Sequence, residues 1–257
     1  MNSKSYQPEE YWTEVGRRIA DREDGKNVIA GDDEPYYRYK RKRFLKLFQR
    51  VNFSGQSVME LGSGPGGNLL EVWKQSPSRL AGVDISEQML ELAKNKVPKG
   101  VELHKTNGTQ IPFEGEEFDI VFTATVLQHN TDEEMLKKIM AEVARVSGKK
   151  VFLFERIEKK IKGDELCYGR PVSYYSKIME SHGFRLISKE FINIKVSYYV
   201  CGAIRKLLNP ASRKEGEPLN RPSVFLQNIA LPVTSLLDRV FRSPTNIARL
   251  EFERIKK

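Results

Sequence analysis

The sequence predicts an α/β fold built on a Rossmann-like, doubly wound sheet with helices on both faces. Apolar stretches of strand length alternate with longer stretches whose apolar residues recur at helical spacing. Glycine is concentrated directly after the first strand-like stretch, where Gly62, Gly64, Gly66 and Gly67 follow one another closely. This alternation, with a glycine-rich turn after the first strand, is typical of α/β domains that bind a nucleotide-like ligand.

The composition is that of a folded globular protein. The chain has 257 residues, of which 39% are hydrophobic, 30% charged and 10% aromatic. This length is compatible with one large α/β domain or two small ones, and we expect one domain with additions. Cys167 and Cys201 have neither metal-ligand spacing nor the pattern of a disulfide framework, so we expect no metal site and a reducing, cytoplasmic compartment.

The net charge of +9 is the main compositional anomaly. It indicates an anionic partner, such as nucleic acid, a phosphate-bearing substrate or an anionic membrane surface. The start of the chain resembles no secretory leader, and no apolar run approaches the roughly 20 residues that span a bilayer. We therefore expect neither export nor a transmembrane segment.

Residues 1–52 predict a helical cap ahead of the sheet. A short helix is expected around residues 11–19, and a second begins after Pro35. Residues 36–50 contain seven Lys or Arg residues and no acid. Because apolar side chains recur at helical spacing, one face should pack on the core and the other should be basic. These apolar residues are Phe44, Leu47, Phe48 and Val51.

The first strand is expected at residues 58–61, followed by the glycine-rich turn and a helix. The spacing Gly62-x-Gly64-x-x-Gly67 fits a dinucleotide fingerprint, so the glycines alone do not separate nicotinamide enzymes from other nucleotide-cofactor enzymes. Glu60 stands at the end of the strand, two residues before the first glycine. Its carboxylate suits a cationic group and would repel a pyrophosphate, which disfavours a dinucleotide.

A second strand is predicted at residues 79–84 and ends in Asp84, 22 residues beyond Gly62. A βαβ unit places that carboxylate beside the glycine turn, where it can accept hydrogen bonds from two ribose hydroxyls. The alternative role is to cap the following helix, for which Ser86 is also available. Ile85 is then expected against the adenine face.

Three further strands are expected at residues 101–106, 118–123 and 149–155. Thr131 with Glu134 three residues later predicts a capping box for the helix between the last two. The segment Thr123 to Asn130 leaves the carboxyl end of one strand, and ligands of doubly wound sheets bind at that edge. We therefore expect this segment to border both cofactor and substrate.

The E-x-G-x-G run from Glu60, the acid at Asp84 and the stretch from Asn107 to Phe113 together resemble the class I S-adenosylmethionine-dependent methyltransferases, of the methyltransferase domain 11/25 type, over residues 58–155. The resemblance implies S-adenosylmethionine as cofactor. The family usually has Asp where Asn107 stands, so the adenine contact would depend on a neutral amide. The implied cofactor-binding residues are Glu60, Gly62, Ser63, Gly64, Gly66, Asp84, Ile85, Met89, Asn107, Gly108, Thr123 and, from the helix that covers the cofactor in this family, Arg38, with Tyr36, Tyr37 and Arg41 as further candidates.

The family fold implies a seven-stranded sheet whose last strand is antiparallel. A helix at residues 173–182 and a strand at 184–192 precede an insertion, and the last strand is expected at 247–255. Two alternatives stay open for the insertion. Its helices pack on the sheet, or they present an apolar and basic surface to an acyl chain or membrane. The predicted units are residues 1–52 (cap), 53–195 (cofactor-binding core), 196–245 (helical insertion and substrate lid) and 246–257 (last strand).

The predicted reaction is methyl transfer to a small-molecule or sugar or glycoconjugate acceptor, at oxygen. The glycan part rests on a resemblance of the long insertion to bacterial methyltransferases of surface-glycan and lipid-linked sugar pathways. His129 is the candidate base, because imidazole titrates near neutral pH and its loop should border the acceptor. Tyr168, Arg170 and Glu155 are further candidates for acceptor contacts.

Three alternative functions remain open at this point: an RNA methyltransferase, a noncatalytic nucleotide-binding scaffold, and an NAD-dependent oxidoreductase. Nucleic acid is not expected as a partner, because no base-methylation motif and no appended recognition module accompany the basic residues. We expect a cytoplasmic protein, with contact between residues 196–242 and the inner face of the membrane as the open alternative.

Overall fold

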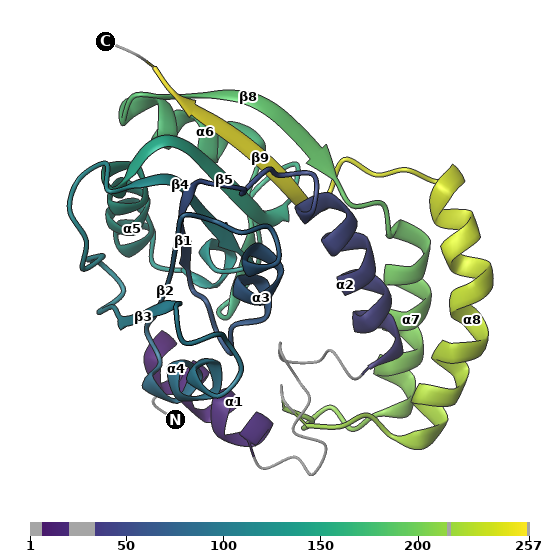
Figure 1. The fold of residues 1–257 in the computed structure, drawn as a ribbon. Coiled ribbons are helices and arrows are strands. Elements are labelled where there is room, and N and C mark those ends of the chain that lie inside the picture. The colour runs from purple at the N-terminus through teal and green to yellow at the C-terminus, as the bar shows by residue number, and fades with distance from the viewer. Residues whose placement is uncertain (1–6, 21–33, 215–216, 256–257) are drawn as a thin grey trace.

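The computed structural model describes residues 7–20, 34–214 and 217–255. Within them a seven-stranded sheet has the order β3-β2-β1-β4-β5-β9-β8 (Figure 1). β9 is antiparallel to both of its neighbours, β5 and β8, whereas the other neighbouring strands pair in parallel. The predicted fold class, with an antiparallel last strand, is therefore confirmed. The strands are β1 (Ser57–Leu61), β2 (Arg79–Asp84), β3 (Glu102–Lys105), β4 (Phe118–Ala124), β5 (Ser147–Ile157), β8 (Phe184–Phe191) and β9 (Asn246–Arg254).

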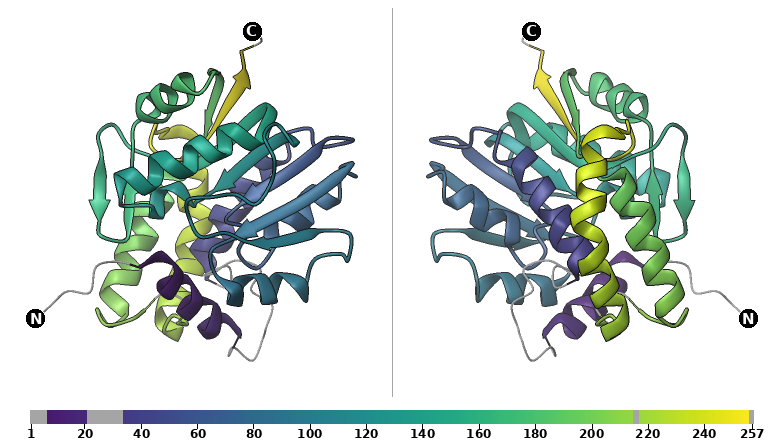
Figure 2. Two further views of the ribbon diagram at one scale, coloured as in Figure 1. Left: turned by 90° about the vertical axis from the view of Figure 1, so that its left-hand side faces the viewer. Right: turned by 90° about the vertical axis from the view of Figure 1, so that its right-hand side faces the viewer.

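Helices cover both faces of the sheet (Figure 2). Side chains alternate along each strand, so Met59 and Leu61 join one apolar cluster while Val58 joins another. The first cluster contains residues of α5 and α6, and the second contains residues of α2, α3 and α7. The helices are α1 (Pro8–Ala20), α2 (Pro35–Phe48), α3 (Gly67–Trp73), α4 (Glu87–Lys94), α5 (Glu133–Val146), α6 (Val172–Ser181), α7 (Lys195–Leu208) and α8 (Arg221–Val240).

The predicted packing face of α2 meets the sheet through aromatic rings. The Phe48 ring lies 5.3 Å from that of Phe122 and 5.2 Å from that of Phe154, between ring centroids. Phe44 also meets Phe154, at 5.4 Å. Such pairs are each worth about 0.5–1.5 kcal/mol beyond the area they bury. This contact fixes α2 beside the carboxyl end of the sheet, where its other side chains reach the site.

The capping prediction for α5 was wrong. Asp132, not Thr131, is the N-cap residue, and its Oδ1 accepts hydrogen bonds from the backbone N–H groups of Glu134 (2.8 Å) and Met135 (3.1 Å). The Thr131 hydroxyl instead donates to the carbonyl of Glu165. A carboxylate at this position both accepts the orphan N–H groups and complements the positive end of the helix dipole, so Asp132 is favoured over a neutral threonine.

One further feature differs from the expected pattern. A hairpin of β6 (Lys162–Asp164) and β7 (Cys167–Gly169) follows β5 and was not predicted. Pro232 lies inside a continuous α8, on its exposed side. α7 and α8 form the predicted helical insertion, and α8 packs against both α7 and α2 (Figure 2). No helix among the described residues is long and apolar enough to span a membrane.

Candidate cofactor and acceptor site

The glycine-rich turn after β1 is shaped by positive backbone φ angles. Gly62 has φ +71°, and a Cβ placed there would lie 2.3 Å from Cγ2 of Val126 in the loop after β4. Gly64 has φ +50°, and a Cβ there would meet no atom within 4 Å. Glycine is therefore needed at Gly62 for close packing of two loops, and at Gly64 for its backbone angle and an open approach to the backbone.

Asp84 lies at the carboxyl end of β2 and holds this turn in place. Its Oδ2 accepts a hydrogen bond from the Gly64 N–H at 2.8 Å, and its Oδ1 accepts one from the Ser86 N–H at 2.9 Å. Burial raises the pKa of Asp84, against the lowering effect of these backbone donors. Ser86 caps α4 through the Met89 N–H, so capping does not require Asp84. Its oxygens retain lone pairs that can accept from two ligand hydroxyls.

Glu60 lies behind the turn, fully buried, and does not line the cavity. Its Oε1 accepts a hydrogen bond from Asn68 Nδ2 at 2.6 Å, and Asn68 Oδ1 accepts one from Arg41 Nη1 at 2.6 Å. Burial raises the pKa of Glu60 to about 8, although Asn68 and the Arg41 charge act in the opposite direction. Oε2 has no hydrogen-bond partner among the described residues. At neutral pH Glu60 is therefore protonated in the cofactor-free protein, and a cation bound in the cavity near Asn68 would favour its ionised form.

A second buried acidic residue, Glu155, holds the loop after β4 in place. Glu155 accepts hydrogen bonds from the Thr123 hydroxyl (2.7 Å) and from the N–H groups of Val126 (3.1 Å) and Gln128 (3.2 Å). Thr125, within this loop, has φ +60°, an uncommon conformation for a residue other than glycine. Glu155 therefore fixes the shape of the loop and lies outside the lining of the cavity.

Arg170 is also a support of this loop. It is buried and donates hydrogen bonds to the carbonyls of Leu127 (3.2 Å) and Asn130 (2.7 Å), and it forms an ion pair with Glu133. Tyr168 does not line the cavity either. The three further acceptor candidates, Glu155, Arg170 and Tyr168, thus do not line the cavity, and the first two hold the loop that carries His129.

His129 lines the cavity and has hydrogen bonds at both ring nitrogens. Nδ1 lies 2.9 Å from the carbonyl of Leu166, and Nε2 lies 3.1 Å from Gln128 Nε2. Since Gln128 Oε1 accepts from the Arg156 N–H, the Gln128 amide donates to His129 Nε2, which assigns the ring proton to Nδ1. The edge of the ring also contacts Trp12 of α1, at 4.9 Å between centroids.

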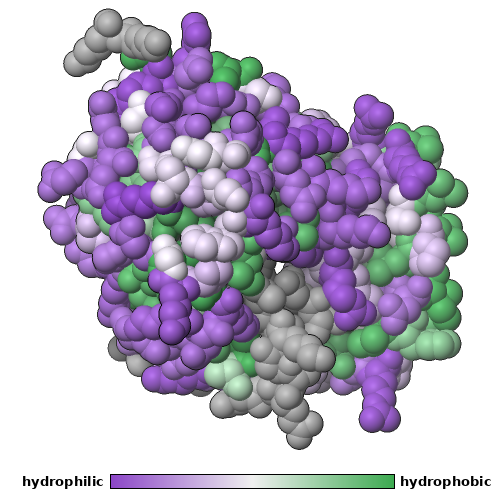
Figure 3. Space-filling model, viewed as in Figure 1, coloured by the Kyte–Doolittle hydropathy of each residue, from purple (hydrophilic) through white to green (hydrophobic). Residues whose placement is uncertain are grey.

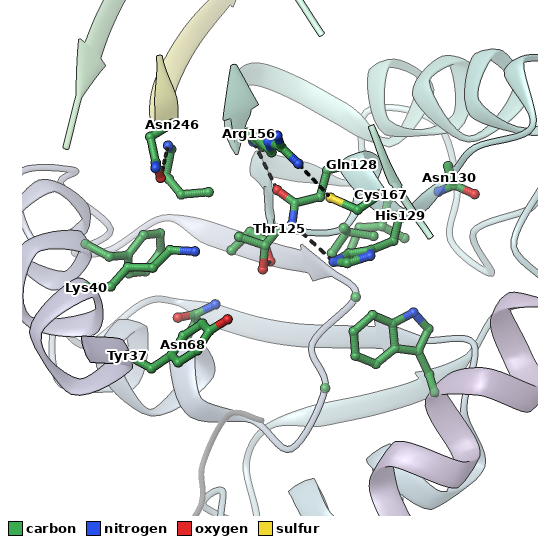
Figure 4. A pocket seen from close by; sticks show the side chains of 18 of the residues that line it. Tyr37, Lys40, Asn68, Thr125, Gln128, His129, Asn130, Arg156, Cys167 and Asn246 are labelled. Atoms are coloured by element: carbon green, nitrogen blue, oxygen red, sulfur yellow. Dashed lines mark hydrogen bonds between the residues drawn. The ribbon is translucent and has the colours of Figure 1, made fainter. Parts of the chain in front are cut away.

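The glycine turn, Asp84 and His129 line one cavity of about 680 Å³, a volume in the usual range for small-molecule sites (Figure 4). The cavity brings together most of the residues predicted from sequence. Those that line it are Gly62, Ser63, Gly64, Asp84, Ile85, Met89, Gly108 and His129; those that do not are Glu60, Gly66, Asn107, Thr123 and Arg38.

For two of the residues outside the cavity lining, Asn107 and Arg38, the geometry explains why they do not line it. Asn107 is exposed, and its Oδ1 accepts from the N–H groups of Thr109 (3.0 Å) and Gln110 (2.9 Å), so it closes its own turn. Arg38 lies on a neighbouring face of α2 from the one that lines the cavity, which carries Tyr37, Lys40, Arg41 and Phe44 at helical spacing. The position of a residue in the cavity lining does not test its binding role, so the cofactor contacts remain predictions.

The part of the cavity away from the glycine turn is lined by α2, α7 and the start of β9. Most of its residues were not predicted from the sequence. In Figure 4, Tyr37 and Lys40 lie across the cavity from His129 and Asn130. Arg205 of α7 donates a hydrogen bond to the Tyr37 hydroxyl at 2.8 Å. The helical spacing was visible, but no pattern indicated which face of α7 is turned inward. The lining from this side includes Lys195, Tyr198, Tyr199, Arg205, Thr245 and Asn246.

Comparison with known proteins agrees with this geometry. A family model described as a methyltransferase domain matches residues 58–149. The uncharacterized methyltransferase YdaC of Bacillus subtilis is 28% identical over 155 residues, which are 59% of this chain and 84% of that protein. The ubiquinone biosynthesis O-methyltransferase of Coxiella burnetii is 25% identical over 126 residues, which are 48% of this chain and 53% of that protein.

Among solved structures, magnesium protoporphyrin IX methyltransferase (ChlM) from Synechocystis PCC 6803 with bound SAM has a similar fold, with a TM-score of 0.59 and 14% identity over 98% of this chain and 100% of that one. The family model covers the glycine turn, Asp84 and the loop after β4, and the chain spans about half the length of the Coxiella enzyme. These matches do not identify the acceptor. Residues 58–149 are a class I S-adenosylmethionine-dependent methyltransferase domain, with S-adenosylmethionine as its cofactor.

Proposed function

We propose that this enzyme transfers the methyl group to a hydroxyl of a small-molecule acceptor, in particular a sugar or glycoconjugate. The observation that carries the proposal is the continuity of the cavity. The half lined by the glycine turn and Asp84 passes into a half lined by tyrosine, lysine, arginine and asparagine side chains. Phenol, amide and cationic groups are suited to binding a polyhydroxyl compound or an anionic group attached to it.

We propose that the cofactor is held by the turn, by Asp84 at its ribose hydroxyls and by Ile85 and Met89 at its base, with Glu60 and Asn68 near its cationic end. When bound, S-adenosylmethionine supplies an activated methyl group: the acceptor oxygen forms the new C–O bond while the S–C bond breaks and its electron pair stays on sulfur. The chain itself contributes orientation and a base for the hydroxyl proton.

His129 is the proposed base. The Nδ1–H bond to the Leu166 carbonyl orients the ring and leaves Nε2 unprotonated, which is the form that can take a proton. Nε2 accepts from the Gln128 amide. An acceptor hydroxyl would have to replace that amide at Nε2, so the loop must adjust by a small side-chain movement when the acceptor binds.

The test is a methyl-transfer assay with sugar nucleotides, lipid-linked sugars and free sugars, alongside small hydrophobic hydroxyl compounds. We expect methylation of at least one sugar-bearing acceptor. In the His129→Ala variant kcat should fall about 100-fold or more, with the Kd for S-adenosylmethionine unchanged. Asp84→Ala is the matched control for the other half of the cavity and should lose cofactor binding instead.

Methylation confined to hydrophobic compounds would refute the sugar acceptor. Unchanged turnover in His129→Ala with intact cofactor binding would remove His129 as the base. Loss of cofactor binding in that variant would instead assign it a structural role.

We also propose that residues 196–245 form a lid over the acceptor, and that the protein is cytoplasmic with contact between residues 196–242 and the inner face of the membrane. The lid proposal is supported by Tyr198, Tyr199 and Arg205, which line the cavity from α7. Acceptor saturation curves for Tyr199→Ala, with a raised KM and an unchanged Kd for the cofactor, would support the lid. A KM equal to that of the wild type would argue against it.

A further inference from the structure

α8 buries its polar side chains. Ser223, Gln227, Thr234 and Asp238 are each 5% exposed or less and recur along one side of the helix. Gln227 Oε1 accepts from the N–H of Tyr36 in α2, at 3.3 Å. These side chains take the positions that apolar residues occupy in an ordinary surface helix.

Asp238 is the centre of these contacts. It accepts hydrogen bonds from the Tyr39 hydroxyl of α2 (2.9 Å), the Ser197 hydroxyl of α7 (2.6 Å) and the Val196 N–H (2.6 Å). Thr234 adds a hydrogen bond with the Ser197 hydroxyl at 2.9 Å. Turning α8 about its axis would leave these buried and partly buried donors without an acceptor, so the orientation of the helix is fixed by hydrogen bonding.

Because the polar side of α8 faces its neighbours, its apolar side chains are exposed on the other side. At 3.6 residues per turn, the most exposed of them lie within about a quarter of the helix circumference. Figure 3 shows hydrophobic residues along the edge of the molecule where Figure 1 places α8. We call this row the α8 stripe; it consists of Phe225, Ile229, Val233, Leu236 and Val240, and Leu226 and Leu237 extend it on one side.

The charges around the α8 stripe are basic. Arg221 and Arg239 are exposed along one edge of it, and Arg242 is exposed just beyond its end. Among the described residues from 196 to 242, Glu217 and Asp238 are the acids, and Asp238 is buried. A second copy of a chain with net charge +9 would bring basic groups against basic groups, whereas an anionic surface complements them.

We propose that the α8 stripe docks on an anionic lipid bilayer, with α8 lying in the plane of the interface. A helix of 20 residues is about 30 Å long, with an apolar side for the acyl boundary and arginines for the headgroups. The inference rests on the membrane contact proposed above, and it is independent of the acceptor.

The test is co-sedimentation with vesicles, without cofactor or acceptor. The whole chain should bind vesicles of phosphatidylcholine with phosphatidylglycerol, and bind phosphatidylcholine alone at least tenfold more weakly. Ile229→Asp with Val233→Asp should lower binding at least tenfold. Arg221→Gln with Arg239→Gln should lower it about tenfold and reduce its salt dependence.

The matched control is Ile161→Asp with Ile187→Asp, two exposed isoleucines outside the stripe, and it should bind like the wild type. Cofactor binding by every variant checks that the site is folded, so failure of the docking is distinguishable from failure of the enzyme. Equal binding by the stripe variant would overturn the proposal. Absence of vesicle binding would also overturn it. If sedimentation equilibrium then finds a dimer that the stripe variant dissociates, the α8 stripe is covered by a second copy of the chain instead of a bilayer.

Discussion

In the glycine-rich turn after β1 the decisive contacts are made by backbone, whereas in α8 they are made by buried polar side chains. Gly62 packs against Val126 with no room for a Cβ, and the Gly64 N–H donates to Asp84. In α8, Asp238 and Gln227 bond to neighbouring helices, and apolar residues face outward. The sequence pattern of the turn indicates its role directly. The pattern of α8 indicates a helix with a polar and an apolar side, and it does not indicate which side packs on the rest of the fold.

The largest effect is expected from Asp238→Ala. The variant leaves the Tyr39 hydroxyl, the Ser197 hydroxyl and the Val196 N–H without their acceptor, so the free energy of unfolding should fall by about 3–5 kcal/mol. Urea unfolding measures it. Asp164→Ala is the matched control, since Asp164 also accepts two backbone N–H bonds but is exposed, and it should cost about 1 kcal/mol. Equal losses of unfolding free energy in the two variants would show that the hydrogen bonds of Asp238 do not hold α8 in place.

Gly62→Ala should destabilise the fold by about 2–4 kcal/mol, because it combines a left-handed backbone with a collision against Val126. Gly64→Ala has the unfavourable backbone angle without the collision, and should cost about 1–2 kcal/mol. Thermal unfolding of the two variants compares them. A smaller loss for Gly62→Ala than for Gly64→Ala would contradict the role given to loop packing.

The raised pKa of Glu60 predicts that the stability of the fold depends on pH. Its pKa is about 8 in the folded chain against an ordinary 4.5, so the folded state holds a proton that the unfolded state has lost. Its contribution is fully present below pH 4.5 and decreases as the pH rises towards 8. Without cofactor, Glu60→Gln should therefore lose less stability than the wild type between pH 5 and 8. Unfolding curves across this range, parallel for the two proteins, would argue against a protonated Glu60.

The smallest effect is expected from Ile229→Ser with Val233→Ser. Both side chains are more than half exposed, so the free energy of unfolding should change by no more than about 0.5 kcal/mol. Ile139→Ala, in the buried face of α5, should cost about 2–5 kcal/mol. A loss above about 2 kcal/mol in the serine variant would mean that the α8 stripe supports the fold rather than an external contact.

The fold was largely predictable because it depends on local patterns. The strands, the glycine turn and the helix at residues 35–48 follow from apolar periodicity and from glycine, and the strand order follows from the family resemblance. The cap of α5 was mistaken because Thr131 and Asp132 stand side by side, and only the backbone geometry decides which side chain reaches the first turn. The hairpin of β6 and β7 lacked an apolar alternation that would have indicated it.

The site divides in the same way. Asp84, Gly62 and Gly64 were found from sequence because spacing alone brings the carboxyl ends of neighbouring parallel strands together. The placement of Glu60 behind Asn68, of Arg41 rather than Arg38 at the cavity, and of Arg205 beside Tyr37 depends on helix rotation and on contacts between distant segments. Sequence determined the part of the cavity around the glycine turn and the order of the elements, since these follow from local periodicity. Tertiary structure decided the part of the cavity walled by α2 and α7 and the outward side of α8, since a helix can turn either side to the core until its partners are fixed.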